Sequence, residues 1–310
     1  MPTRPRKLMV EAINAFQEQK ADKAPETKRK YRRVLQVLAT YCEQRQLRFV
    51  PDVTVEALDA YVIERRKLNA TWLKEIEILR QFFGFCVKRK WIDENPALDI
   101  ERPRLPERDD IVPYTPDEVV RIIAATNTIG RSSYERLRAR AMVLLLRFAG
   151  LRISDVVTLS RDHTQGDYLQ KRAIKNGAKL QVLLEPFVRN ALEALPHPKA
   201  APRDSRLYFA SGNASVRTLV KGAERTLAAV FKRSGVEGAF AHRFRHTLAS
   251  ELLGKGESIE VVAAILGDTP AVIRKHYAKW TPEFQSRQDG ATRRIHGTNL
   301  AQTEAVAIKC

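Results

Sequence analysis

The chain has 310 residues, enough for one large domain or two ordinary ones, and its 44% hydrophobic and 29% charged residues are typical of a globular protein with real cores. No run approaches the roughly 18 consecutive apolar residues of a membrane-spanning helix, and the basic N-terminus lacks the apolar stretch of a secretory signal. The net charge of +18 favours a polyanionic partner, because Lys and Arg placed at phosphates release condensed counterions. A solvated basic surface is the alternative.

The cysteines Cys42, Cys86 and Cys310 are odd in number and show no metal-ligand spacing. Cys42 and Cys86 fall inside helical patterns, where a small buried hydrophobic residue is expected. The sequence therefore implies neither disulfides nor zinc, and it predicts a reducing, cytoplasmic location.

The first part of the chain, residues 8–100, is predicted to be entirely helical. The segment from Thr27 carries an amphipathic stripe of Tyr31, Val34, Leu35, Leu38, Tyr41 and Cys42. Basic residues crowd the first half of this helix, where the helix dipole disfavours cations. Contacts with nucleic-acid phosphates explain these charges better than helix stabilisation does, although a solvated face is the alternative. The candidate phosphate-binding residues are Lys28, Arg29, Arg32 and Arg33.

A second amphipathic helix is predicted from about Thr71, with its stripe at Ile76, Leu79, Phe82, Phe83 and Cys86. We expect it to run through residues 87–91 and to be stopped by the Glu94-Asn95-Pro96 tripeptide, because a residue before proline avoids the α region. Residues 101–113 contain three prolines and seven charges without periodicity, as in a linker. The predicted organisation is a helical domain at 1–103, a linker at 104–113 and a larger domain at 114–310.

The larger domain begins with a capping box, in which Thr115 is the N-cap, Pro116 is N1 and Glu118 is N3. An apolar helix follows and ends at Gly150. Two short strand-like runs within 168–184 flank Asn176-Gly177, which indicates a β-hairpin. Most of the remaining chain has helical patterns, with N-cap signals at Ser258 and Thr269. The fold class is therefore mainly α with a small antiparallel sheet.

Five residues in this domain could act on a phosphodiester. Arg152 follows Gly150 and lies at a helix start, where its guanidinium and free backbone N–H groups could both bind an anion; a surface pair with Asp155 is the alternative. His242 and Arg245 share one helix face, with Phe244 turned to the core. Taken singly, Tyr277 could be a packing residue and Lys175 a solvated turn lysine.

In sequence order, GLRISD (150–155), IKNG (174–177), HRFRHTLASELL (242–253), LGDT (266–269) and KHYAKW (275–280) closely resemble the motifs of the tyrosine recombinase, or phage integrase, family. The N-terminal T-x3-Y-x3-L pattern and the segment LRQFFGFCVKRKWIDENPA (79–97) resemble the family's SAM-like core-binding domain, which clamps DNA. The resemblance covers all but about the last thirty residues, and it implies an α+β DNA breaking-rejoining domain after the helical one.

The resemblance implies that Tyr277 attacks the scissile phosphate, forms a 3′-phosphotyrosyl bond and releases a 5′-hydroxyl. Arg152 and Arg245 would hold the non-bridging oxygens, Lys175 would protonate the leaving oxygen, and His242 would assist proton transfer at the tyrosine. The chemistry of tyrosine is consistent with these roles, because a tyrosine with a pKa near ~10 needs a proton acceptor at neutral pH. Fixed guanidiniums also stabilise the extra negative charge of the transition state.

The remaining implications concern supporting residues and partners. Asp155 would orient the pocket and His246 would support it. Covalent capture conserves the phosphoester bond energy, so neither a metal nor another cofactor is expected. The partner would be double-stranded DNA, bound by a homotetramer on two DNA sites during integration, excision or a related recombination, with no role for a membrane.

Asp268 departs from the family, which usually has histidine or tryptophan after the Leu-Gly pair. An ionised carboxylate cannot donate a hydrogen bond to a phosphate and would repel it. Asp268 could instead turn outward, or it could orient Arg152 or Arg245.

Three other functions compete with recombination. The first is a catalytically weak or inactive DNA-binding accessory protein of the same fold, which Asp268 favours and the otherwise intact motif set disfavours. The second is a type IB topoisomerase, which the recombinase-like N-terminal domain disfavours. The third is a basic helical RNA-binding protein, for which the sequence lacks aromatic stacking signatures.

Overall fold

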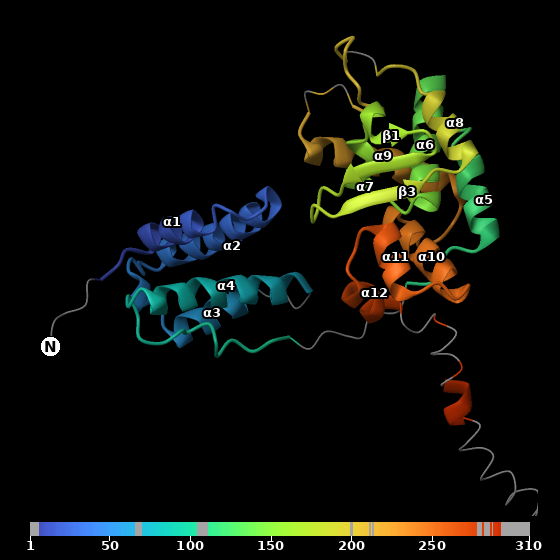
Figure 1. Ribbon diagram of the computed structural model, residues 1–310. Coiled ribbons are helices and arrows are strands. Elements are labelled where there is room, and N and C mark those ends of the chain that lie inside the picture. Colours follow the sequence, from blue (N-terminus) through green and yellow to red (C-terminus); the bar gives the residue numbers. More distant parts are fainter. Residues whose placement is uncertain are drawn as a thin grey trace, which may run out of the picture. The chain divides into compact units, whose positions relative to one another are not determined.

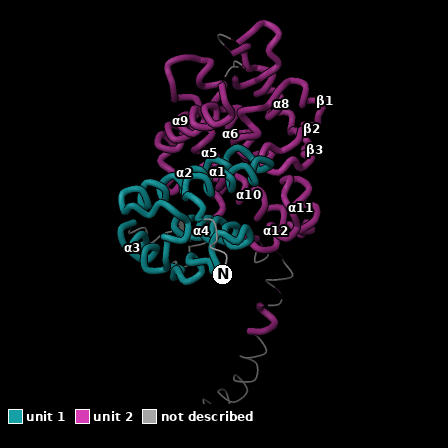
Figure 2. The backbone as a smooth tube through the Cα atoms, turned by 90° about the vertical axis from the view of Figure 1, so that its left-hand side faces the viewer, with its two compact units in different colours: residues 1–109 teal, residues 110–310 magenta. Residues whose placement is uncertain are grey.

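The structure is a computed structural model that describes residues 6–65, 70–103, 111–198, 201–210, 212, 214–277, 281, 286 and 288–292. Figure 2 shows its two compact units, residues 1–109 and residues 110–310. The described chain is mainly helical with one small antiparallel sheet, which confirms the predicted fold class. No helix in these ranges is long and apolar enough to cross a membrane. Cys310 and most of the predicted linker lie outside the described residues.

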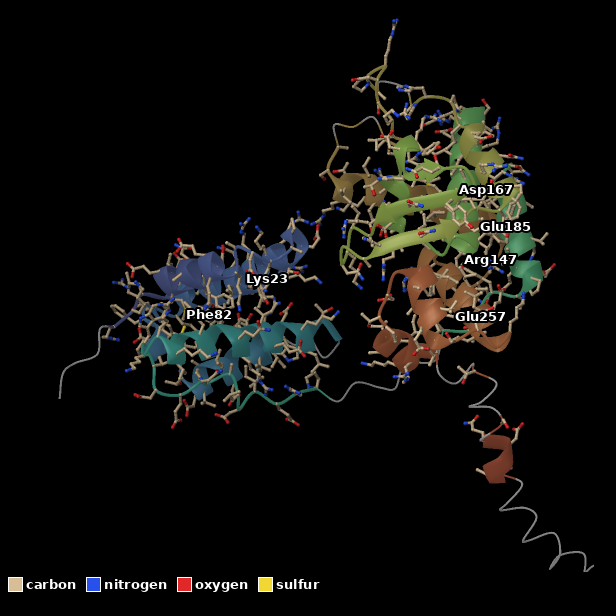
Figure 3. All side chains as sticks on the ribbon, in the orientation of Figure 1. Lys23, Phe82, Arg147, Asp167, Glu185 and Glu257 are labelled. Atoms are coloured by element: carbon tan, nitrogen blue, oxygen red, sulfur yellow. The ribbon has the colours of Figure 1, made fainter. Side chains whose placement is uncertain are left out.

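The first unit is built from four helices and a short 3-10 turn. These are α1 (Met9–Gln19), α2 (Pro25–Gln44), the turn Val50–Asp52, α3 (Val55–Arg65) and α4 (Ala70–Lys88). The predicted stripes of α2 and α4 are buried, except that Tyr31 is half-buried. The ring of Phe16 meets the rings of Phe82 and Phe85 edge-on in this core, and Figure 3 labels Phe82 among the helices. Cys42 and Cys86 are buried free thiols, as predicted.

Helix α4 ends earlier than predicted. Its last helical residue is Lys88, and Lys90 adopts a left-handed conformation with φ of 61°. The N–H of Trp91 then donates to the carbonyl of Cys86, and the N–H of Lys90 to that of Val87. This is a Schellman motif, which satisfies the free carbonyls at the helix end. Local capping, and not the Glu94-Asn95-Pro96 tripeptide, terminates the helix.

The second unit surrounds a small sheet with helices, and Figure 1 shows α10, α11 and α12 gathered below β3. Its helices are α5 (Pro116–Ala125), α6 (Ser133–Phe148), α7 (Ile153–Val157), α8 (Pro186–Glu193), α9 (Val216–Ser234), α10 (Ala241–Gly254), α11 (Ile259–Leu266) and α12 (Pro270–Tyr277), with a 3-10 turn at Arg161–His163. The Thr115–Glu118 capping box is present at α5. Ser258 caps α11 through its hydroxyl, also as predicted.

The predicted hairpin is confirmed, but its turn differs from the prediction. The sheet order is β1 (Thr164–Gln165), β2 (Tyr168–Arg172), β3 (Lys179–Leu183), all antiparallel, and the short β1 was not predicted. Asn176-Gly177 is not a two-residue turn, because residues 173–178 all lie between the paired strands. Within this loop only Gly177 has a positive φ, 68°, whereas a type I′ turn needs two such residues.

Two glycines let the connecting loops approach the sheet and the helices closely. Gly267 follows α11 with φ of +59°, and a Cβ there would lie 2.2 Å from Leu180 on β3. Gly150 follows α6 with φ of +60°, and a Cβ there would lie 2.6 Å from Leu266. Glycine is needed at both positions for conformation and for space. These two loops carry the groups of the candidate site.

Candidate active site

Arg152 is the N-cap residue of α7, directly after the Gly150 loop. Its Nη2 donates to Oδ2 of Asp268 at 2.6 Å, and its Nη1 to the carbonyl of Gly267 at 3.3 Å. The alternative, a surface pair with Asp155, is not formed, because the Asp155 carboxylate binds the N–H of Ile174. Arg152 therefore joins the start of α7 to the loop after α11.

Arg245 lies on α10 and is only 3% exposed. Its Nη1 donates to the carbonyl of Gly150 at 2.7 Å, and its Nη2 donates to the carbonyl of Leu266 at 2.6 Å and to Oδ2 of Asp268 at 3.0 Å. Burial lowers the pKa of this guanidinium and nearby Arg152 lowers it further, while Asp268 opposes both. The two arginines thus meet at one carboxylate oxygen, which marks a point where an anion can be bound.

The rings of two histidines on α10 and of the predicted nucleophile on α12 lie next to one another in a row. The ring centroids of His242 and His246 are 5.0 Å apart, and those of His246 and Tyr277 are 5.2 Å apart. The ring of His242 keeps an exposed surface. Desolvation by the surrounding protein nevertheless lowers its pKa to about 4, and the charges of His246 and Arg245 act in the same direction. Burial lowers the pKa of His246 to about 4, and the charge of nearby His276 acts in the same direction. Both imidazoles are therefore neutral at pH 7 and can accept a proton.

The neutral state of the two histidines can be tested by titration of the free protein. Because both folded pKa values lie below the ordinary value, the ring resonances of His242 and His246 should not shift between about pH 8 and about pH 5.5, whereas in urea they should titrate near about 6.5. Heteronuclear NMR with assignments from His242→Gln and His246→Gln measures this. A midpoint near 6.5 in the folded protein would contradict the neutral state.

Tyr277 is the last residue of α12 and is 5% exposed. Burial raises the pKa of its phenol to about 12, and Asp268 contributes in the same direction, whereas Arg245 and Arg152 lower it. The phenol is protonated at neutral pH, so an attack on phosphorus needs a proton acceptor. The neutral ring of His246 lies against it, with His242 one helical turn away.

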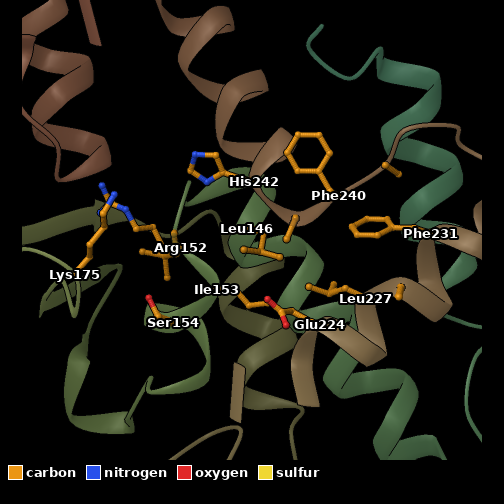
Figure 4. A pocket seen from close by; sticks show the side chains of 14 residues that line it. Leu146, Arg152, Ile153, Ser154, Lys175, Glu224, Leu227, Phe231, Phe240 and His242 are labelled. Carbon is orange, nitrogen blue, oxygen red and sulfur yellow. The ribbon is translucent and has the colours of Figure 1, made fainter. Parts of the chain in front are cut away.

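A pocket of about 700 Å³ brings three of the predicted residues together. Figure 4 shows the charged ends of Arg152 and Lys175 directed to the same region, with His242 beside them. The rest of the lining is largely apolar and includes Phe231 and Phe240. Lys175 itself is exposed in the β2–β3 loop. Arg245 and Tyr277 do not line this pocket. Arg245 is connected to Arg152 through Asp268, and Tyr277 is connected to His242 through the ring of His246.

Asp155 and one residue that the sequence reasoning missed lie beneath this pocket. Asp155 is fully buried, and its Oδ1 accepts the N–H of Ile174, directly before Lys175, at 2.8 Å. Lys171 on β2 is also buried, with its Nζ 3.7 Å from Oδ1 of Asp155. The alternation of β2 could have revealed it, because Leu169 and Lys171 are both inward positions and a lysine is unusual there.

The predicted phosphate-binding residues of the first unit are all exposed on α2. Arg29 pairs with Glu26, and Lys28 donates to the carbonyl of Ala21 at 3.2 Å. Arg32 and Arg33 are exposed one turn further along the helix. These side chains belong to the first unit, and the pocket residues belong to the second.

Comparison with known proteins places this geometry in context. Residues 114–283 match the phage integrase family. The tyrosine recombinase XerC of Chlamydia pneumoniae is 30% identical over 67% of this chain and 67% of its own, and that of Anoxybacillus flavithermus is 23% identical over 73% and 78%.

Two solved structures share the fold. One is a lambda integrase dimer bound to a COC′ core site, with a TM-score of 0.63 and 17% identity over 87% of this chain and 77% of its own. The other is the Tn1549 transposon integrase in complex with circular intermediate DNA, with a TM-score of 0.67 and 16% identity over 91% and 99%.

Proposed function

Because the chain belongs to the phage integrase family of tyrosine recombinases, we propose that the site where Arg152 and Arg245 meet, beside this pocket, is where it cuts and rejoins DNA during site-specific recombination. The observation that carries this assignment is the single oxygen of Asp268 that both guanidiniums bind. Two converging arginine forks are suited to a tetrahedral anion whose charge increases in the transition state. The anion proposed here is the scissile phosphate.

In the proposed reaction, the phenolic oxygen of Tyr277 forms a bond to phosphorus as the bond to the 5′-oxygen breaks. The phenolic proton passes to a neutral imidazole, with His242 as the acceptor and His246 supporting it. The 5′-oxygen leaves with a proton from Lys175. Rejoining is the reverse attack, by a 5′-hydroxyl on the phosphotyrosine, and it needs no outside energy because the phosphoester bond is conserved.

The proposal for Asp268 is that it orients the two arginines and partly offsets their mutual repulsion. Asp268→Asn and Asp268→His should then both slow single-turnover cleavage, by on the order of tenfold, as part of the 10²–10³ that one lost oxyanion contact typically costs. Rapid-quench cleavage of a suicide substrate measures the rates. Faster cleavage by both variants would show a carboxylate that opposes the phosphate, and unchanged rates would exclude either role.

We propose that the helical domain of residues 1–103, which lies within the first unit, clamps DNA through the exposed basic face of α2. Replacing Arg32 and Arg33 with glutamine should weaken binding to all duplex sequences and reduce the slope of log affinity against log salt by about 0.9 per lost contact. Fluorescence anisotropy over a salt series measures the slope. Arg121→Gln is the control, since its ion pair with Asp117 on α5 already compensates its charge. An equal slope in all proteins would make α2 a solvated face.

The assembly is proposed from structural neighbours, among which is a lambda integrase tetramer bound to a Holliday junction. By extension, this chain would act on double-stranded DNA as a homotetramer that joins two sites. The free thiols of Cys42 and Cys86 are compatible with the expected cytoplasmic location.

The test of the proposed activity is a suicide substrate, a nicked duplex taken from the flanking ends of the element that carries the gene. A covalent protein–DNA adduct that protease removes supports cleavage through a protein nucleophile. Specific binding without an adduct would favour the accessory protein, for which Asp268 is the one sequence argument. Relaxation of supercoiled DNA without a target site would instead favour a type IB topoisomerase.

A further inference from the structure

Strand β2 carries a lysine where an apolar side chain would ordinarily pack. Its residues alternate between exposed and buried, and the buried positions are Leu169 and Lys171. The paired position on β3 is the buried Leu180. The side chain of Lys171 is only 2% exposed. A buried ammonium group is unfavourable unless it is fully paired, so its contacts should reveal what it contributes.

Within the described residues, the Lys171 ammonium makes its hydrogen bonds and its ion pair with α7 and the residue after it. Nζ donates to the carbonyl of Asp155 at 2.8 Å and to the hydroxyl of Thr158 at 2.9 Å, and it lies 3.7 Å from Oδ1 of Asp155. Burial lowers the pKa of Lys171, and Asp155 opposes that shift. The side chain therefore joins β2 to the short helix that begins after Arg152.

Asp155 connects this lysine to both edges of the pocket. Its backbone N–H donates to the carbonyl of Arg152 at 2.8 Å. Its Oδ1 accepts the N–H of Ile174, the neighbour of Lys175. Its Oδ2 is buried and has no hydrogen-bond partner within the described residues. The charge of Asp155 thus depends on the nearby Lys171 for its compensation.

We propose that Lys171 is a positioning residue that fixes the β2–β3 loop against α7, and thereby holds Lys175 beside Arg152 at the scissile phosphate. This rests on the proposed function of the pocket. Without Lys171, the Asp155 carboxylate would be buried and uncompensated, and its bond to Ile174 would weaken. The loop that carries the exposed Lys175 would then keep its internal hydrogen bonds and the bond of the adjacent Asn176, whose amide donates to the carbonyl of Gly267 at 3.2 Å, but not its attachment to α7.

The test changes the leaving group, because a mispositioned Lys175 would impair only the transfer of a proton to the leaving 5′-oxygen. A suicide substrate whose bridging 5′-oxygen is replaced by sulfur leaves as a thiolate, with a thiol pKa of about 8.5 against about 15.7 for water, and needs little general-acid help. Lys171→Met should cleave the oxygen substrate on the order of tenfold to a hundredfold more slowly than wild type, within the 10²–10⁴ of general-acid catalysis. It should cleave the sulfur substrate at close to the wild-type rate.

Two variants calibrate this result. Lys175→Ala should show the same selective loss, and a larger one. Lys179→Met makes the same change at an exposed position of β3, and it should cleave both substrates like wild type. If Lys171→Met does not fold, Lys171→Met/Asp155→Asn removes both charges and keeps an acceptor for Ile174. A smaller loss, still selective for the oxygen substrate, is expected, because the bond to Ile174 is kept while β2 loses its bonds to Asp155 and Thr158.

Equal slowing of both substrates would show that Lys171 only stabilises the fold, and wild-type rates on both would show that it has no role; either result overturns the inference. Failure of the proposed function is separable, because wild type would then form no adduct with either substrate.

Discussion

Tyr277→Phe is expected to abolish the covalent protein–DNA adduct while leaving DNA affinity little changed. The substitution removes only the oxygen that we propose attacks phosphorus, and the buried ring can keep its place against His246. Without that oxygen the proposed phosphotyrosyl bond cannot form, so the loss should reach the detection limit. Denaturing gel electrophoresis of the suicide-substrate reaction measures the adduct, and a mobility-shift assay measures the affinity.

Tyr168→Phe provides the matched control. It removes a phenolic hydroxyl from the same unit, at a residue of β2 that is 45% exposed, and it should form adduct like wild type. Adduct at the wild-type level in Tyr277→Phe would show that another residue is the nucleophile. Thermal unfolding of both variants checks that the unit is folded.

Arg245→Lys should reduce cleavage by 10² or more, about the effect of removing an oxyanion donor, while most DNA affinity remains. Lysine keeps the charge but cannot bind the Gly150 carbonyl, the Leu266 carbonyl and Asp268 together, as the arginine fork does. Single-turnover kinetics and equilibrium binding separate the two effects.

Because Arg245 also holds loops together, its replacement should lower thermal stability, and the control must share that property. Arg243→Lys lies two residues away on α10 and loses bonds to the Val112 carbonyl and to Glu118, away from Asp268. It should destabilise the unit without a comparable loss in the cleavage rate. Equal cleavage by Arg245→Lys and wild type would mean that charge suffices without the fork.

Features encoded within one element were predictable from the sequence. The stripes of α2 and α4 follow helical periodicity, and the capping box of α5 is a four-residue signal. The shared face of His242 and Arg245, with Phe244 turned into the core, follows from helical spacing alone. The site residues themselves came from the order of the motifs and their family resemblance, and their roles remain proposals.

Features that join distant elements were not predictable in this way. The bond from Arg152 to Asp268 spans 116 positions, and neither motif indicates which way Asp268 turns. The alternation of β2 marks Lys171 as an inward-facing lysine, but it does not identify Asp155 as its partner. The loop of residues 173–178 is also set by tertiary bonds, including that of Asn176 to the Gly267 carbonyl, which override the local preference of an Asn-Gly pair.

The two carbonyls that Arg245 binds have a consequence for DNA recognition. Leu266 is the last residue of α11, and Gly150 follows Ala149, the C-cap residue of α6, so the guanidinium lies near the C-terminal ends of two helices, where their dipoles are negative. That field holds a cation beside Arg152 in the free protein, despite their repulsion. Folding itself therefore brings the two positive charges together, so that the proposed phosphate site is assembled before DNA binds.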